Sequence, residues 1–402
     1  MNPNDNEKLE MSEEDLKKPF GSEWKKYFSL GPINLNHGSY GTIPIPILKV
    51  KHKLAESIEN DPDYFIRYKA ESGIRNVIND IAEIVSADKS DIMIVSSASD
   101  GVNAFYKSIN WSKGDKIFFY NTVYGMTRQL FNHLKEKFEV DLIECILTRE
   151  IIEDEVKLID FTKEFVEKNG PFKAANLEHI GSIPTFIYPI ESLINLFQKD
   201  QTIVLVDGAH AIGNIPINLK NFRADGYLSN LHKWMFAPRG SAFLYVNKNF
   251  QKILHPNIIS HHYKTDLQKE FIIPCTMDYS VWLTAKIAIA WRKQIGEQKI
   301  QEFTNNLAWE AGLAVSKIWG TRLLIEHEKR LASMVNVECY GNIRKEEVND
   351  RMREFKERYG TFLAMFWFDG KNYVRLSGQI YNTVEEFEKV AKDFIEFYQK
   401  YC

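Results

Sequence analysis

The chain has 402 residues, of which 44% are hydrophobic and 26% charged, an ordinary composition for one large or two average globular domains. Its 51 basic and 54 acidic side chains leave a formal charge of −3, which excludes a global attraction to nucleic acid or anionic lipid. No apolar stretch approaches the roughly 20 residues of a membrane-spanning helix, and the polar residues 1–18 do not resemble a secretory signal. Four widely spaced cysteines without a CxxC motif favour a reducing compartment, so we expect a cytoplasmic enzyme or metabolite-binding protein.

The first elements along the chain are predicted to be helical. Residues 1–18 are expected to form a flexible tail because they are polar and lack an apolar core. After Pro46, apolar residues recur at three- and four-residue spacing, which predicts a helix over 47–60. A second helical stretch is expected over 62–85.

Short apolar runs then alternate with helical stretches. Seven strands are predicted in this part of the chain, at 92–95, 116–120, 139–147, 173–180, 202–206, 224–229 and 241–246. Strand–helix alternation indicates right-handed crossovers and a mostly parallel sheet covered on both faces. Wholly apolar runs such as IVLV favour strands that are buried on two sides. The expected fold class is α/β, with a large, mostly parallel seven-stranded sheet domain.

The last third of the chain predicts a smaller α/β domain. Residues 280–319 have a helical pattern, and a final helix is expected from Thr383. Strands are predicted between them, near 331–339, 361–368 and 372–377. We expect three structured parts: an N-terminal segment that packs on the small domain (19–60), the large domain (61–296) and the small domain (297–402).

One candidate functional segment is TIVLVDGAHAIG, residues 202–213, in which a buried strand ends at Asp207. His210 follows after two small residues. Ligands of parallel α/β sheets bind at the carboxyl ends of the strands, so this acid is well placed for chemistry. An aspartate that caps the following helix is the alternative interpretation.

A second candidate is GYLSNLHKWMFAPRG, residues 226–240, which places Lys233 beside an aromatic residue after another strand. A lysine that loses solvation there has a lower pKa and becomes a better nucleophile. An ordinary surface lysine is the alternative. Asp207 and Lys233 lie 26 residues apart on successive strand ends, the pair that pyridoxal phosphate requires.

The segment SSASDGVNAF, residues 96–105, forms a strand-to-helix turn of small residues. Its exposed backbone N–H groups and the helix N-terminus would hold a phosphate without a Walker motif. Many strand–helix turns have this composition, so the segment is informative only together with Asp207 and Lys233.

Eight motifs in the same order resemble the class V aminotransferase family of fold-type I pyridoxal-phosphate enzymes. The resemblance is to the branch of isopenicillin N epimerase-like proteins and hercynylcysteine sulfoxide lyases. The motifs are LNHGSYGTIP (35–44), SSASDGVN (96–103), VYGM (123–126), LEHIGSIPTFIYPI (177–190), VDGAHAIG (206–213), SNLHKW (229–234), PCTMDYS (274–280) and VRLSGQIYN (374–382).

The resemblance implies pyridoxal 5′-phosphate as cofactor, with Lys233 as the Schiff-base lysine and the acid/base for the Cα proton. Asp207 is expected to pair with the pyridinium nitrogen, and His210 to bond near the phenolic oxygen of the ring. Tyr124 is expected to stack on the ring. The residues expected at the phosphate are Ala98, Ser99, Asn230 and His232.

The resemblance also implies a substrate site and a partner. Arg375 is expected to grip the substrate carboxylate, because guanidinium makes two parallel hydrogen bonds to it; pairing with an acidic neighbour is the alternative. Asn36 and His37 are expected to line the same pocket. Thr276 lies where the family's partner subunit reaches the phosphate, which implies a homodimer with shared active sites. Cys275 replaces the usual glycine there, and SSAS replaces the more common Asn-Ala-Thr.

Three other groups of residues have simpler interpretations. His255, His261 and His262 lack the carboxylate or thiol spacing of a metal site, so no metal is expected. Basic residues in 344–358 alternate with acids at helical spacing, as on a solvated helix face. Cys339 lies in a strand-like segment rather than in the mobile loop of a cysteine desulfurase.

The expected reaction is a β-elimination that breaks the C–S bond of a cysteine-derived S-conjugate or sulfoxide, such as hercynylcysteine sulfoxide. The alternative is an amino-acid epimerase of the isopenicillin N type. A cysteine desulfurase, an aminotransferase and a non-catalytic binding module are further alternatives. The intact Asp207, His210 and Lys233 argue against the last of these.

Overall fold

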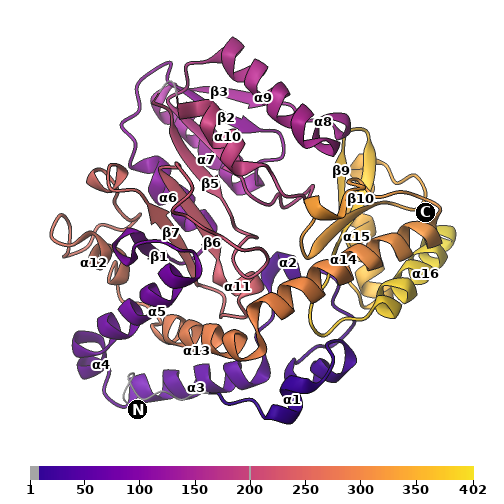
Figure 1. Cartoon of the computed structure of the whole chain (residues 1–402), viewed down its shortest axis with the longest axis horizontal. Helices are drawn as coiled ribbons and strands as arrows, with labels where there is room; N and C mark the ends of the chain where they lie inside the picture. The colour runs from indigo at the N-terminus through magenta and orange to yellow at the C-terminus, as the bar shows by residue number, and fades with distance from the viewer. Residues whose placement is uncertain (1–8, 199–200) are drawn as a thin grey trace.

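A seven-stranded sheet forms the centre of the large domain. The computed structural model describes residues 9–198 and 201–402 (Figure 1). The strand order is β1-β7-β6-β5-β4-β2-β3, and β7 alone runs antiparallel to its neighbours. The strands are β1 Ile92–Val95, β2 Lys116–Tyr120, β3 Asp141–Cys145, β4 Ala174–Glu178, β5 Ile203–Asp207, β6 Gly226–Asn230 and β7 Ala242–Val246. The expected mostly parallel α/β sheet is therefore confirmed.

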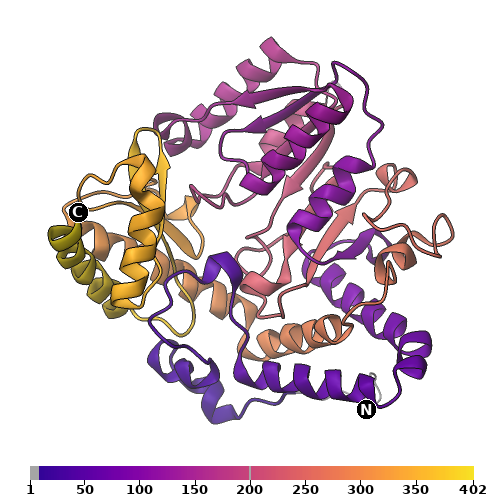
Figure 2. The same cartoon turned by 180° about the vertical axis from the view of Figure 1, so that it is seen from behind.

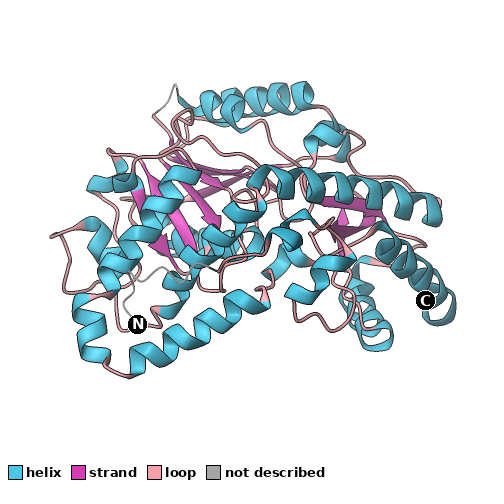
Figure 3. Cartoon of the chain, turned by 60° about the horizontal axis from the view of Figure 1, so that its bottom comes forward, coloured by secondary structure: helices cyan, strands magenta, loops and turns pink. Residues whose placement is uncertain are grey.

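Helices cover both faces of this sheet because its central strands are buried on both sides. Figure 3 shows the strands enclosed between helical layers. On one face lie α6 and α7, and on the other α5, α9 and α10. The helices of the first two-thirds of the chain are α1 Glu13–Lys17, α2 His37–Tyr40, α3 Ile45–Glu59, α4 Pro62–Tyr68, α5 Ala70–Ile84, α6 Ala98–Lys107, α7 Gly125–Phe138, α8 Arg149–Glu153, α9 Glu155–Asn169, α10 Ile190–Phe197, α11 Leu231–Trp234 and α12 Leu267–Ile272.

The small domain contains a three-stranded antiparallel sheet in the order β8-β10-β9. Its helix α14 packs on β8 and on the C-terminal helix α16. Gly296, with a φ of +104°, separates α14 from the preceding α13. The elements are α13 Ser280–Ile295, α14 Glu297–Trp319, β8 Met334–Glu338, α15 Val348–Tyr359, β9 Ala364–Phe368, β10 Lys371–Ser377 and α16 Val384–Tyr401.

The N-terminal segment contacts both domains (Figure 2). Gly21 N–H donates to Ile380 O at 2.7 Å, and Leu35 O accepts from Ser377 N–H at 2.9 Å, so the first part lies on the small domain. Helix α3 instead packs along α13, which differs from the expectation for residues 19–60. Helix α3 buries Ile47, Val50 and Ile58, whereas the small sheet is already covered by α14.

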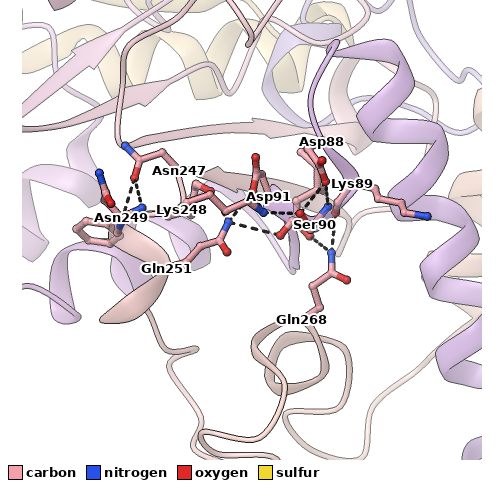
Figure 4. A network of polar contacts seen from close by, with 12 residues as sticks. Asp88, Lys89, Ser90, Asp91, Asn247, Lys248, Asn249, Gln251 and Gln268 are labelled. Atoms are coloured by element: carbon pink, nitrogen blue, oxygen red, sulfur yellow. Dashed lines mark hydrogen bonds and ion pairs between the residues drawn. The ribbon is translucent and has the colours of Figure 1, made fainter.

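A polar network on the surface ties the start of β1 to two later segments (Figure 4). Asp91 forms an ion pair with Lys248 at 2.5 Å and accepts from Gln251 Nε2 at 2.7 Å. Gln268, on α12, donates to Ile92 O at 3.0 Å. These contacts fix the strand whose other end leads into α6.

The described helices include none with both the length and the apolar character needed to cross a bilayer.

Candidate active site

The candidate active site lies where the parallel strands β4, β5 and β6 end. A cavity of about 250 Å³ is present there, with Ser39 and Tyr40 of α2 on its wall. We call it the active-site cavity. Its position agrees with the rule that parallel α/β sheets bind ligands at the carboxyl ends of their strands. Among the residues predicted from the sequence, those that line it are Ala98, Ser99, Tyr124, Asp207, His210, Asn230, His232 and Lys233.

Lys233 occupies the third position of the short helix α11, directly after β6. Its Nζ lies 2.9 Å from Nε2 of His210. Burial and the nearby Arg375 cation lower the pKa of Lys233 to about 7, although Asp207 opposes this shift. Burial and the Lys233 charge lower the pKa of His210 well below its usual range, so His210 is neutral. Lys233 is therefore a nucleophile at neutral pH.

Two contacts from distant segments hold the backbone of α11. His37 Nε2 lies 2.7 Å from Lys233 O, and its Nδ1 lies 3.0 Å from the hydroxyl of Tyr381. Because a carbonyl oxygen only accepts, Nε2 carries the proton and Nδ1 accepts from Tyr381. Arg292 donates to the carbonyl oxygen of Trp234 and to Gly213 O at 2.9 Å.

Gly41 explains how α2 comes so near to α11. A Cβ atom at this position would lie 1.9 Å from His232 O, and the φ of Gly41 is +66°. Only glycine fits both the close approach and the left-handed backbone. Gly41 therefore allows the HGSYG segment to reach the site.

Asp207 is the last residue of β5 and is buried. Its Oδ1 accepts from the N–H of Ala209 at 2.9 Å. Burial raises the pKa of Asp207, whereas the Ala209 amide and the Lys233 charge lower it. Because this carboxylate is buried at the cavity, it can neutralise a positively charged nitrogen of a ligand there.

The N-terminus of α6 faces the same cavity. Ser97 caps this helix by accepting from the N–H of Asp100, and Asn230 Oδ1 accepts from the N–H of Ala98 at 2.8 Å. Asn230 therefore orients this turn, and its side-chain oxygen Oδ1 is already used in that hydrogen bond. His232 lines the cavity as well, and its buried Nδ1 has no hydrogen-bond partner among the described residues. A helix N-terminus with free polar groups nearby suits an anion such as phosphate.

These groups fit the expected pyridoxal 5′-phosphate. Lys233 offers an amine with a low pKa, Asp207 a buried carboxylate, and the α6 turn with His232 an anion site. The buried Nδ1 of His210 also lacks a partner among the described residues, as expected for a side chain that awaits a ligand. The cofactor would thus be held at three places by three different strand ends.

Arg375, in β10, is a buried cation without a buried anion to balance it. It donates to Ser182 O at 3.0 Å, to Asn36 Oδ1 at 2.8 Å and to Ser39 Oγ at 2.7 Å. Within the described part of the chain no carboxylate lies within ion-pair distance of it, and its buried Nε has no partner. The alternative of an acidic neighbour is therefore not observed. Burial lowers the pKa of Arg375 to about 10, which leaves it charged at neutral pH.

The other predicted residues take different positions. Tyr124 is 46% exposed at the start of α7, and its ring is free to meet a ligand in the cavity. Asn36 bonds to Arg375 rather than lining the cavity itself, and the buried His37 lies behind Lys233. Both differ in this respect from the expectation that they line the pocket. Thr276 is exposed and lies outside the cavity of its own chain.

Several residues at the site were not singled out from the sequence. Glu178 and Thr122 line the cavity, Ser182 accepts from Arg375, and Arg292 holds α11. Glu178 could have been recognised by the same rule as Asp207, because it also ends a buried strand. Arg292 gives no local signal, since it lies in an ordinary helical pattern.

Two alternative sites from the sequence are not formed. His255 lies 2.8 Å from the buried Glu270, and no group of three potential metal ligands occurs among the described residues. Cys145 and Cys339 are buried, and burial raises the pKa of Cys145 to about 12. None of the four cysteines lines the active-site cavity.

Comparison with known proteins gives a match to one family over most of the chain. The family model described as aminotransferase class-V matches residues 64–390. The hercynylcysteine sulfoxide lyase of Schizosaccharomyces pombe is 28% identical over 390 residues, which cover 94% of this chain and 98% of that protein. An L-cysteine desulfhydrase of Arabidopsis thaliana is 24% identical, with 96% and 91% covered. The isopenicillin N epimerase of Streptomyces clavuligerus is 21% identical, with 89% and 93% covered.

Solved structures share the same fold. A cystine C–S lyase in complex with cysteine persulfide superposes with a TM-score of 0.78 at 15% identity, covering 90% of this chain and 96% of that one. At this identity the likeness establishes the architecture alone.

Proposed function

The chain belongs to the class V aminotransferase family of pyridoxal-phosphate enzymes, and from this we propose that it is a C–S lyase. Its substrate is a cysteine-derived S-conjugate or sulfoxide, of which hercynylcysteine sulfoxide is the leading candidate. The observation that carries the proposal is that Lys233 and Asp207 line one cavity, while Arg375, which has no ion-pair partner, lies behind its wall and bonds to the lining residues Ser39 and Ser182. The similarity to a sulfoxide lyase along nearly the whole length of both proteins supports this reaction over the alternatives.

Each step needs a specific residue. Arg375 binds the substrate carboxylate, because it has a buried, unpartnered N–H and a positive charge. When bound, pyridoxal 5′-phosphate supplies the electron sink that makes the Cα proton of the substrate removable. Lys233 takes this proton, since a pKa of about 7 lets it accept and return a proton at neutral pH.

The surrounding residues keep these groups in place. His37 and Arg292 bond to the carbonyl oxygens of Lys233 and Trp234, so the backbone that carries the amine keeps its position through each cycle. Asp207 supplies the negative charge for the pyridine nitrogen of the cofactor. The electron pair left at Cα then forms the Cα–Cβ double bond while the sulfur substituent departs with the electron pair of the C–S bond. The 2-aminoacrylate that is released reacts with water to give pyruvate and ammonia.

The test is incubation of the loaded enzyme with L-cysteine, its S-conjugates, their sulfoxides and a panel of D- and L-amino acids. Pyruvate release and chiral analysis are followed together. We expect pyruvate from one class of sulfur substrate, and none with the Lys233→Ala variant. Inversion at Cα without pyruvate would establish the epimerase instead.

We further propose a homodimer with shared active sites in the cytoplasm. Thr276 is exposed, and two exposed apolar side chains, Ile258 (51%) and Ile259 (57%), precede it along the chain. A two-fold arrangement would place each copy's Thr276 at the phosphate of the other. The four unpaired cysteines accord with a reducing compartment. A fully active monomer at micromolar concentration in the ultracentrifuge would contradict the dimer.

A further inference from the structure

Glu178 is a second buried acid beside Asp207. It ends β4 as Asp207 ends β5, and the two residues are paired in the parallel register, so their side chains lie on the same face. Both are buried, and both line the active-site cavity. Two carboxylates so close together in a buried site do not both ionise readily, because each charge opposes the other.

The hydrogen bonds around Glu178 leave one of its two carboxyl oxygens without a partner. Thr122 Oγ1 donates to Oε2 at 3.1 Å, and the hydroxyl of Tyr188 lies 2.8 Å from the same Thr122 oxygen. Oε2 is therefore an acceptor. Oε1 is buried and finds no hydrogen-bond partner among the described residues. A proton on Oε1 gives the cavity wall a neutral donor that lacks an acceptor.

The charged and titratable groups that face Glu178 do not neutralise an anion there. Burial, and to a smaller extent the charge of Asp207, raise the pKa of Glu178 to about 8, although hydrogen bonds from Thr122 and Tyr188 oppose this. Arg128, on α7, lowers the pKa of Glu178 through its charge, but it is paired with Glu144 at 2.5 Å. The phenols of Tyr106, on α6, and Tyr120, on β2, also face Glu178.

We propose that Glu178 is a cofactor-binding residue that stays protonated at neutral pH and donates a hydrogen bond from Oε1 to an oxygen of the bound cofactor. Asp207 then remains the single anion at this edge of the cavity. The inference rests on pyridoxal 5′-phosphate as the ligand, not on the reaction that follows. Binding must weaken once Glu178 loses its proton, because the donor disappears and a second negative charge replaces it.

The experiment compares cofactor affinity in the wild type and in Glu178→Gln, whose amide keeps a donor but does not ionise. Apoenzyme is titrated with pyridoxal 5′-phosphate between about pH 6 and about pH 10. The ratio of the two dissociation constants cancels the titration of groups that do not interact with Glu178. We expect a constant ratio up to about pH 8 and then a rise of about tenfold per pH unit for the wild type.

Infrared spectra give a readout without the cofactor. The carboxylic-acid carbonyl band should be present in the wild-type apoenzyme near neutral pH and missing in Glu178→Gln. The matched control is Glu270→Gln, because Glu270 is equally buried but is paired with His255 outside the cavity. This control should leave the affinity profile unchanged.

A constant ratio over the whole pH range, or no difference in the acid band, overturns the proposal. If Glu178→Gln does not fold, Thr122→Val provides the test, because it removes a hydrogen bond that lowers the pKa of Glu178. The alkaline loss of cofactor affinity should then move to higher pH. A loss that occurs at the same pH as in the wild type would also overturn the proposal. Neither measurement depends on lyase activity, so failure of the proposed reaction is seen separately.

Discussion

Replacing Arg375 by lysine tests the substrate site while keeping a basic residue. The guanidinium reaches Ser182 with one terminal nitrogen, and Asn36 and Ser39 with the other. A lysine has one nitrogen and cannot serve both sides and a substrate carboxylate together. The loss of one charge-assisted contact is about 1.5–3 kcal/mol, which weakens substrate binding roughly ten- to 150-fold.

The pH dependence of the variant gives a sharper signature. Burial lowers the pKa of Arg375 to about 10 from an ordinary value of 12.5. The same burial acting on a lysine ammonium lowers its pKa as well, from an ordinary value that is already below that of arginine. The Arg375→Lys variant should thus lose substrate affinity further as the pH rises across the assayed range, whereas the wild type stays charged.

The assay measures KM and kcat from pH 6.5 to 9 at saturating cofactor, with cofactor affinity determined separately. A substrate amide without the carboxylate charge should discriminate little between the two proteins. Arg128→Lys is the matched control, because Arg128 pairs with Glu144 and does not touch Arg375. If Arg375→Lys retains the wild-type KM, or loses the cofactor instead, the assignment of Arg375 to the substrate carboxylate is wrong.

Further predictions concern Lys233, Asp207 and Arg292. Borohydride reduction should attach the cofactor covalently to the wild type and not to Lys233→Ala. Detection of attached cofactor on the variant by mass spectrometry would contradict the assignment of Lys233. The rate at which apoenzyme binds cofactor should rise with pH through about 7, as Lys233 loses its proton. Arg375→Gln should move the midpoint of this rise to higher pH, because it removes a neighbouring cation. An unchanged midpoint would contradict the proximity of Arg375 to Lys233. Asp207→Ala should nearly eliminate exchange of the α-proton with solvent while circular dichroism stays native; normal exchange would refute its role. Arg292→Met should lower the free energy of unfolding, measured by thermal melts, by about 2–4 kcal/mol, because two buried carbonyls lose a charged donor. The control Lys293→Met breaks an exposed ion pair with Glu83 and should change the free energy of unfolding by less than about 1 kcal/mol.

Strand positions in the large domain could be predicted because their residues are apolar and contiguous. The run predicted at 202–206 corresponds to β5, Ile203–Asp207, within one residue at each end. The run at 139–147 was predicted too long, since β3 covers Asp141–Cys145 only. Its length is set by pairing with the five residues of β2, and this depends on the partner strand rather than on local sequence.

The same distinction applies to the site. Asp207 and Lys233 could be found because each directly follows an apolar strand, so local sequence reveals both their position and their chemistry. Arg375 was found only through the resemblance to a family. The role of His37 behind Lys233 was not predictable from the pattern, because it is defined by contacts to Lys233 and Tyr381 that join segments far apart in the chain.

The bridge from Lys233 through His37 to Tyr381 has a consequence for the order of biosynthesis. His37 and Tyr381 are separated by 344 residues, so the hydrogen bond between them forms only after Tyr381 has been synthesised. At 5–20 residues per second, roughly 17–70 s pass between the synthesis of His37 and that of Tyr381. The sheet that carries Asp207 and Lys233 emerges well before then. A nascent chain stalled before β10 should therefore contain both residues but lack the His37–Tyr381 hydrogen bond that supports α11, and it should bind cofactor weakly until Tyr381 has left the ribosome.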